Sequence, residues 1–586
     1  MSSVFPSLTS AEFADSVDAL VRELDELEAL FCDKQIDRPN AEVTIDPAVF
    51  DEVLNGVNAA WEHFGVLRAF VAGFTSTDSR DELAAARASE LDPPGSRLGK
   101  LLTKLVAWVG SSDTTALIQA SRIAADHEFF VLRAETLSRH QMDPTLEDLS
   151  ADLDITGSVA WRRLYSNVTS RILVDLRLGE EAQKLPVSKI RSLAADPDRT
   201  IREAAYRSEL EAWKAHEVPI AAALNSIKGE TLTLCARRGW ESPLDAAVFG
   251  AHIDRETLFA MLAAARRAFP DFRRYLTAKA RSLGIDRMAF FDLFAPLPGY
   301  FRTWEYDEAE EFIVRQFESY SGKLGDFAAR AMRERWIDAE SRPGKVDGAF
   351  CMSVRKDESR ILLNFKPSFD SVSTFAHELG HGYHNLCLFG RTKLQQGTPM
   401  TLAETASIFC ETIVRNAVLK HGTDSEKLEA LQGSLQGACQ VVVDIYSRFL
   451  FEQGVFERRA KRELSCSELC ALMLQAQQDT YGTGLDGELL HPYMWAAKSH
   501  YYGRSFYNFP YMFGLLFGLG LYKVFERDGD AFKERYDELL SSTGLADAAT
   551  LASNFGIDLR SDDFWEGSFD RIREDIDLFE RLVGAA

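Results

Sequence analysis

Residues 374–385 of this 586-residue chain read TFAHELGHGYHN and contain two histidines, His377 and His381, four positions apart. In an α-helix, residues with this separation lie one turn apart on the same face. Two imidazoles placed in this way can bind one zinc ion, and Glu378, directly after the first histidine, is left free to act as a general base. The segment therefore predicts a buried helix with a metal site. The alternative is a core helix whose histidines are satisfied by hydrogen bonds.

A catalytic zinc ion usually takes three protein ligands, so one more is needed. Three residues downstream are candidates: His384, Glu404 and Glu411. A third ligand from His384 would crowd one short stretch of helix and strain a tetrahedral site. Glu404 and Glu411 share a face of a predicted helix at 401–419, so Glu404 could bind the metal while Glu411 orients a ligand histidine. Thr401 and Glu404 also form a capping-box pattern, so Glu404 could instead close a helix end. The residues alone leave both possibilities open.

Most of the chain has the periodicity of amphipathic helices. Apolar residues recur at three- and four-residue intervals, with charges between them, over residues 11–30, 116–137, 203–224 and 255–269. After a polar break, Thr200 and Glu203 form a capping-box pattern, which predicts that a long helix begins there. We predict a mainly α-helical protein with an N-terminal helical region over residues 1–190 and a catalytic region over residues 191–586.

Strand signals are few. Residues 289–294 are a weak candidate. Two β-prone runs, 348–354 and 361–366, are joined by a polar connection and predict a hairpin directly before the histidine helix. An extended peptide could pair with an edge of this hairpin, near Gly348 and Ala349. The hairpin could equally be a small structural sheet.

The composition excludes some functions. Hydrophobic residues make up 46% and charged residues 26% of the chain, as in soluble globular proteins. A net charge of -23 would repel a phosphate backbone, so we expect no nucleic-acid partner. The uncharged run 505–522 contains Asn508 and Pro510 and predicts a buried helix rather than a membrane span. With no visible secretory signal and eight scattered cysteines, we expect a cytoplasmic protein with no membrane partner. Monomer and dimer both remain open.

A dense set of polar aromatic and histidine side chains follows at residues 491–514, namely His491, Tyr493, His500, Tyr501, Tyr502, Tyr507 and Tyr511. Aromatic residues at this density usually form core. Phenol and imidazole groups near a zinc ion could instead stabilise the oxyanion that forms when water attacks a peptide carbonyl.

From about residue 345 to 520 the chain resembles the oligoendopeptidase F branch of the thimet-oligopeptidase family of zinc metallopeptidases. The matching segments are GAFC at 348–351, ILLNF at 361–365, TFAHELGHGYH at 374–384, AETAS at 403–407, HPYMW at 491–495 and HYYGRSFYNFPYMFG at 500–514. A weaker likeness includes DRTIREAAY at 198–206. The resemblance implies a two-lobed helical zinc-peptidase fold, with a small β-sheet beside the active site and a deep substrate channel that folded proteins cannot enter.

The same resemblance implies the roles of individual residues. It implies one zinc ion per chain, held by His377, His381 and Glu404, with Glu378 as the general base. It further implies His500 and Tyr507 as hydrogen-bond donors to the transition state. Residues expected to contact the substrate are Tyr511, Tyr502, Gly348 and Ala349. The thimet-type branch has a further tyrosine at the position of Gly514 in this chain.

We therefore expect a zinc-dependent endopeptidase that hydrolyses internal bonds of short oligopeptides. A zinc carboxypeptidase or dipeptidase on the same scaffold is an alternative, but no group that would hold a free terminal carboxylate or amine is identifiable from the sequence. A second alternative is a peptide-binding protein that retains the fold without catalysis. The complete set of ligands and base disfavours it.

Overall fold

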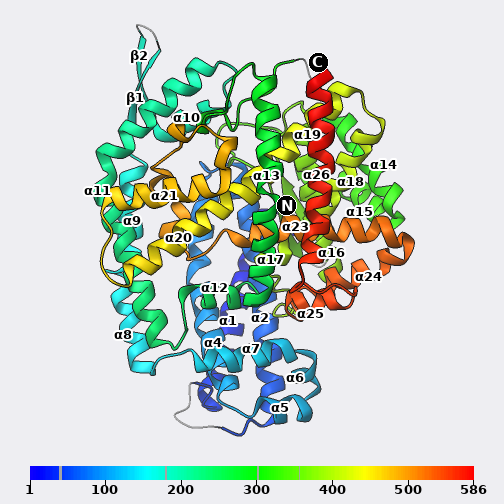
Figure 1. The fold of residues 1–586 in the computed structure, drawn as a ribbon. Coiled ribbons are helices and arrows are strands. Elements are labelled where there is room, and N and C mark those ends of the chain that lie inside the picture. Colours follow the sequence, from blue (N-terminus) through cyan, green and yellow to red (C-terminus); the bar gives the residue numbers. More distant parts are fainter. Residues whose placement is uncertain (38–42, 179–180, 300–301, 356, 586) are drawn as a thin grey trace. The chain divides into compact units, whose positions relative to one another are not determined.

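The fold is that of a computed structural model, which describes residues 1–37, 43–178, 181–299, 302–355 and 357–585. The chain is mainly α-helical with small sheets, as predicted (Figure 1). It forms two compact units, each assembled from three stretches of sequence. Unit 1 comprises Met1–Gln141, Thr303–Ala417 and Val524–Gly556, and unit 2 comprises Met142–Arg302, Val418–Lys523 and Ile557–Ala586. The division into functional regions at residue 190 stays a prediction.

Unit 1 contains most of the early helices and the helix with the two histidines. Its helices are α1 (Ala11–Asp33), α2 (Pro47–Thr77), α3 (Glu82–Glu90), α4 (Asp92–Gly110), α5 (Thr114–Ala120), α6 (Arg122–Asp126), α7 (Glu128–Arg139), α14 (Tyr306–Tyr320), α15 (Gly322–Arg333), α16 (Phe369–Leu388), α17 (Met400–Ala403), α24 (Asp530–Ser541) and α25 (Ala548–Ser553). Two further helices, α18 (Thr405–His421) and α23 (Phe509–Asp528), each cross a boundary between the units.

The periodic segment at residues 116–137 is helical, as predicted, but it does not form one continuous helix. The segment is divided among α5, α6 and α7. Ser121 ends α5, and its hydroxyl then accepts a hydrogen bond from the Ala124 amide at the start of α6. A serine cap offers the backbone an alternative to a continuous helix, although the apolar periodicity runs through it.

Unit 2 contains the longest helix, α11. Its helices are α8 (Pro144–Asp154), α9 (Ser158–Thr169), α10 (Val187–Ser192), α11 (Arg199–Arg237), α12 (Pro243–Gly250), α13 (Arg255–Ser282), α19 (Asp424–Cys439), α20 (Ile445–Arg459), α21 (Cys466–Tyr481), α22 (Met494–Ala497) and α26 (Asp562–Ala585). A π-helical turn, Gln440–Asp444, joins α19 to α20. Short 3₁₀ turns lie at Leu193–Ala195, Phe290–Asp292, Gly482–Gly484, Gly487–Leu489 and Ser499–Tyr502.

Helices α13 and α26 of unit 2 pack along each other. Strands β1 (Leu173–Leu178) and β2 (Glu181–Pro186) form an antiparallel hairpin that extends beyond the end of α11 (Figure 1). The core of this unit gathers large aromatic side chains from α11, α22 and the Ser499–Tyr502 turn, including Trp213, Trp495 and Tyr501. The burial of these side chains stabilises the unit.

In unit 2 the long helix α11 begins where one was predicted, but two local details were predicted wrongly. Helix α11 begins with Asp198 as its cap, whose carboxylate accepts a hydrogen bond from the Thr200 amide, so the expected capping box of Thr200 and Glu203 does not form. Residues 289–294 do not form a strand. They contain the 3₁₀ turn Phe290–Asp292, because the fully buried Asp292 accepts a hydrogen bond from the Ala289 amide and pairs with Arg202.

The predicted hairpin in unit 1 is confirmed. Strands β4 (Phe350–Arg355) and β5 (Glu358–Leu362) are antiparallel, and β3 (Ile337–Asp338) pairs in parallel with β5, which gives the order β3-β5-β4. The strands extend into the connection that was expected to be a turn, of which residue 356 lies outside the described residues. Helix α16 packs against both β4 and β5. The sheet therefore supports the helix that carries the two histidines.

The uncharged run at 505–522 leads into α23, whose side chains Phe513, Leu516 and Phe517 are fully buried. Over the described part of the chain, no helix combines the length and the apolar character that a membrane crossing requires. All eight cysteines are free thiols.

Candidate metal centre

Helix α16 places the two histidines side by side in unit 1. It begins at Phe369, where the hydroxyl of the cap residue Ser368 accepts a hydrogen bond from the Ser371 amide. The imidazole rings of His377 and His381 then lie 4.9 Å apart between centroids and nearly perpendicular, at 83°. Each side chain is 24% exposed. Both can therefore reach a ligand at the same point, as the spacing predicts.

Glu404 joins the two histidines from the junction between α17 and α18. Its Oε2 lies 3.2 Å from Nε2 of His377 and 3.5 Å from Nε2 of His381. One ligand atom from each of these three residues lies within 4.8 Å of the others. Helix α17 begins after Pro399 and has no side-chain cap, so Glu404 does not close a helix start in the way its capping-box pattern would require. His384 lies elsewhere, with its Nε2 3.0 Å from the Thr543 hydroxyl.

Two further side chains orient the cluster. Nδ1 of His377 lies 3.3 Å from Oε2 of Glu411, which follows Glu404 by seven residues and belongs to α18. The Ser407 hydroxyl donates a hydrogen bond of 2.8 Å to Oε2 of Glu404. A carboxylate on the outer nitrogen of a ligand histidine fixes its tautomer and its ring orientation. Glu411 is therefore where the sequence analysis expected such a partner.

Burial and neighbouring charges together set the pKa values of the cluster residues. Burial disfavours the charged form of His377, but hydrogen bonds and charges from Glu404 and Glu411 outweigh it and raise the pKa to about 10. For His381, burial and the neighbouring His377 charge lower the pKa to about 4. Burial would raise the pKa of Glu404, yet the histidines hold it at about 2. These shifts favour a charged His377 and an ionised Glu404, and they favour the neutral form of His381.

Glu378 lies next to the cluster and is only 5% exposed. Burial raises its pKa to about 7. Among the residues that the structure describes, Oε2 of Glu378 has no hydrogen-bond partner. Glu378 also lies near Cys351 of strand β4. Burial raises the pKa of the Cys351 thiol, and the charge of Glu378 raises it further. A buried carboxylate oxygen without a partner is costly unless a ligand or water molecule satisfies it.

The close approach of α16 and α18 depends on Gly380, the glycine between the two histidines. A Cβ atom at this position would lie 2.6 Å from the carbonyl oxygen of Ala406 and 2.6 Å from Cα of Ser407. These are backbone atoms and cannot move aside without shifting the helix. This role was not predicted from the sequence, although a glycine inside a predicted helix is a signal of close packing.

We expect Gly380→Ala to destabilise unit 1 by about 1–3 kcal/mol, because the extra methyl group forces α16 and α18 apart. Since Glu404 precedes α18 directly, the same change should also weaken metal binding. Thermal unfolding and a zinc titration measure the two effects. The control is Gly322→Ala in α15, where a Cβ atom would meet no atom within 4 Å. A Gly380→Ala protein with unchanged stability and zinc affinity would contradict the prediction.

The other predicted catalytic side chains belong to unit 2. His500 lies in the 3₁₀ turn Ser499–Tyr502, and its Nε2 is buried without a hydrogen-bond partner among the described residues. Burial, followed by the charges of Arg448 and Lys498, lowers its pKa to about 3, so the ring is neutral at physiological pH. The hydroxyls of Tyr507 and Tyr511 lie 3.1 Å apart.

The predicted substrate contacts differ in their surroundings. Tyr502 is fully buried, its ring stacks on Tyr165 with centroids 3.7 Å apart, and its hydroxyl donates to the Trp495 carbonyl at 3.3 Å. It is a core residue here, as aromatic residues at this density usually are. Gly348 and Ala349 directly precede β4, an edge strand of its sheet. Gly348 is exposed with φ +82°.

The donor set fits zinc. Two imidazoles and one carboxylate are the ligands of several catalytic zinc sites, which keep a fourth position open. Oε2 of Glu378, which has no hydrogen-bond partner in the described ranges, belongs to the residue directly after His377, and a polar ligand there would satisfy it. A mainly helical fold with H-E-x-x-H on one helix, and with a carboxylate from the junction of α17 and α18 as the third ligand, is typical of zinc metallopeptidases.

The family follows from the sequence over residues 192–571, which matches the model of peptidase family M3. The match covers more than half of the chain. The chain belongs to this family, and it is a metallopeptidase.

Relatives agree with this assignment. The chain is 25% identical over 428 residues to the plasmid oligoendopeptidase F of Lactococcus lactis subsp. cremoris, covering 72% of this chain and 70% of the relative. It is 25% identical over 413 residues to the group B oligopeptidase PepB of Streptococcus agalactiae, covering 69% and 68%. The crystal structure of oligoendopeptidase F from Enterococcus faecium shares the fold, with a TM-score of 0.70 at 16% identity over 98% of this chain and 99% of that chain. The resemblance to oligoendopeptidase F is thereby confirmed.

Proposed function

We propose that this chain is a zinc-dependent endopeptidase that cleaves internal bonds of short oligopeptides. The observation that carries the proposal is the cluster of His377, His381 and Glu404, with ligand atoms within 4.8 Å of one another, beside the unpartnered carboxylate oxygen of Glu378. The names of the relatives, oligoendopeptidase F and oligopeptidase, support peptides as the substrate class. The free cysteines support a reducing compartment, and we place the enzyme in the cytoplasm.

In this proposal His377, His381 and Glu404 hold the zinc ion, and Glu411 keeps Nδ1 of His377 oriented. Zinc supplies Lewis acidity and lowers the pKa of a water molecule. Glu378 accepts the proton that the attacking water loses and passes it to the departing amine nitrogen. Its burial excludes competing solvent, and its Oε2 has no other partner among the described residues.

We assign His500 and Tyr507 as hydrogen-bond donors to the oxygen of the attacked carbonyl. A neutral imidazole and a phenol can each donate one hydrogen bond to a developing oxyanion. The unpartnered Nε2 of His500 supports its assignment, and the hydroxyl of Tyr511, which lies 3.1 Å from that of Tyr507, supports an orienting role for Tyr511. An extended peptide that pairs with β4 beyond Gly348 and Ala349 would complete substrate binding.

The purified full-length protein should contain zinc, and it should cut a short internally quenched peptide that is blocked at both ends. A chelator should abolish cleavage and added zinc should restore it, because the metal activates the nucleophile. Elemental analysis and mass spectrometry of the products measure both properties. Cleavage that persists in metal-free protein would contradict the zinc mechanism. Trimming of unblocked peptides alone would support the carboxypeptidase or dipeptidase alternative, and zinc-free binding without cleavage would support a peptide-binding protein.

A further inference from the structure

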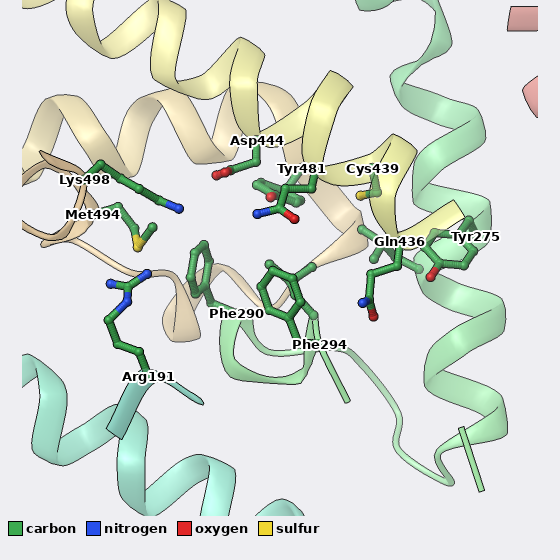
Figure 2. Close-up of a pocket in the computed structure, with 13 residues that line it drawn as sticks. Arg191, Tyr275, Phe290, Phe294, Gln436, Cys439, Asp444, Tyr481, Met494 and Lys498 are labelled. Carbon is green, nitrogen blue, oxygen red and sulfur yellow. The ribbon is translucent and has the colours of Figure 1, made fainter. Parts of the chain in front are cut away.

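Unit 2 contains a pocket that the proposed catalytic chemistry does not use. Its volume is about 50 Å³, room for a few water molecules or one small polar group. Three charged side chains line it, namely Arg191, Asp444 and Lys498. Figure 2 shows their charged ends directed toward one region of the pocket, beside the ring of Phe290.

Two of the three charges are already neutralised by partners. NH1 of Arg191 lies 2.9 Å from Oε1 of Glu209. Asp444 forms an ion pair with Arg448, one turn further along the chain. The ammonium group of Lys498, which lines the same pocket, makes no hydrogen bond and no ion pair within 4 Å to any residue that the structure describes. The pocket therefore carries one excess positive charge.

The charge of Lys498 is partly removed from water, which disfavours its charged form when no anion is bound. Lys498 is half-buried, and burial lowers its pKa to about 8, although the Asp444 carboxylate opposes this effect. An anion that reaches its ammonium group would restore the interaction that water no longer provides. A single excess charge, with Asp444 nearby, matches a singly charged anion better than a phosphate dianion.

The remaining walls are apolar and aromatic. Phe290, Phe294 and Tyr481 line the pocket, and Phe294 is one of the large hydrophobic side chains that are exposed. Such walls suit the apolar part of an amino-acid residue. Part of the lining, including Asp444, comes from the π-helical turn Gln440–Asp444, and insertions of this kind are frequent at functional sites.

The pocket is next to a residue of the proposed catalytic set. Lys498 precedes His500 by two residues, and its charge contributes to the lowered pKa of that histidine. A ligand held at Lys498 would therefore lie close to a group that the proposed function assigns to the substrate carbonyl.

We propose that this pocket binds a carboxylate of the peptide substrate through Lys498, with the residue that bears it against the aromatic walls. The inference rests on the proposed function for the identity of the ligand as a peptide. The carboxylate has two possible sources, the free C-terminus and an acidic side chain.

The test compares three internally quenched peptides that differ only at the C-terminal end. One ends in a free carboxylate, one in an amide, and one in an amide with aspartate as its last residue. We expect the wild-type enzyme to cleave a carboxylate-bearing peptide with a kcat/KM roughly 10- to 100-fold above the plain amide, the size of a charge-assisted hydrogen bond. Which of the two carboxylate peptides is preferred identifies the source. Equal kcat/KM values for all three would overturn the proposal.

Variants assign the preference to Lys498. Lys498→Met should abolish it while cleavage of the plain amide continues, and Lys498→Arg should retain part of it. The control Lys214→Met, an exposed lysine on α11, should behave as wild type. A preference that survives in Lys498→Met would overturn the proposal. If Lys498→Met does not fold, Lys498→Gln takes its place.

A binding measurement separates this inference from the proposed function. Calorimetry with the full-length Glu378→Gln protein and the same three peptides requires no turnover. Tighter binding of a carboxylate peptide that depends on Lys498 would support the pocket even if the wild-type protein cleaved nothing. Cleavage of all three peptides, with neither a kinetic nor a binding preference, would overturn the pocket and leave the proposed function intact.

Discussion

Replacing Glu378 with glutamine is expected to lower kcat for peptide cleavage by about 100- to 10,000-fold, the usual contribution of a general base. Glutamine has the same shape but cannot accept the proton from the attacking water. The zinc content should not change, because the candidate ligands are His377, His381 and Glu404. Steady-state kinetics on a quenched peptide and elemental analysis of the same preparation measure both quantities.

The matched control for this variant is Glu311→Gln on α14, whose side chain is 75% exposed in the same unit. It should leave kcat unchanged. Near-normal cleavage by Glu378→Gln would show that Glu378 is not the base. Loss of zinc together with activity would instead indicate that Glu378 is itself a ligand.

Replacing Lys228 with methionine is expected to destabilise unit 2 by about 3–5 kcal/mol, because the change leaves a buried carboxylate without its counter-ion. Lys228 on α11 and Glu452 on α20 form an ion pair of 2.6 Å, and their side chains are 1% and 3% exposed. Oε2 of Glu452 also accepts a hydrogen bond of 3.0 Å from the Phe506 amide. Phe506 has φ +51°, a left-handed conformation that a bulky residue rarely adopts, so this contact holds a strained turn next to Tyr507.

The double variant Lys228→Met with Glu452→Gln distinguishes an unpaired charge from lost packing. It removes both charges and keeps an acceptor for the Phe506 amide, so it should recover much of the lost stability. Urea unfolding of the variants measures their free energies of unfolding. The control is Lys214→Met, at an exposed position on the same helix, whose stability should lie within about 0.5 kcal/mol of wild type. A double variant no more stable than Lys228→Met would contradict this account.

Local patterns predicted much of the fold. The periodicity of residues 11–30 identified α1, and two β-prone runs identified the hairpin of β4 and β5. The errors arose where a single polar side chain interrupts a pattern. Ser121 divides the helical segment at 116–137. The buried Asp292, which pairs with Arg199 and Arg202, stabilises the 3₁₀ turn Phe290–Asp292 where a weak strand was predicted.

Part of the candidate site could be predicted from the sequence, and part could not. The sequence could place His377, Glu378 and His381 on one helix, and it could name Glu404 only as a ligand or a cap. The structure brings Glu404 to 3.2 Å from His377, and it shows why Gly380 is needed for that approach. The spacing of residues in the sequence cannot predict these contacts, because the residues that meet are more than twenty positions apart.

The sequence by itself determined which donors this protein carries and that two of them share a helix face, since helical periodicity is a property of consecutive residues. Only the tertiary structure decided which carboxylate meets the histidines, that the half-buried Lys498 ammonium group has no ion-pair partner among the described residues, and which buried charges are paired. Those outcomes depend on the packing of segments that are distant in the chain, where contact and burial set the energy of each charge.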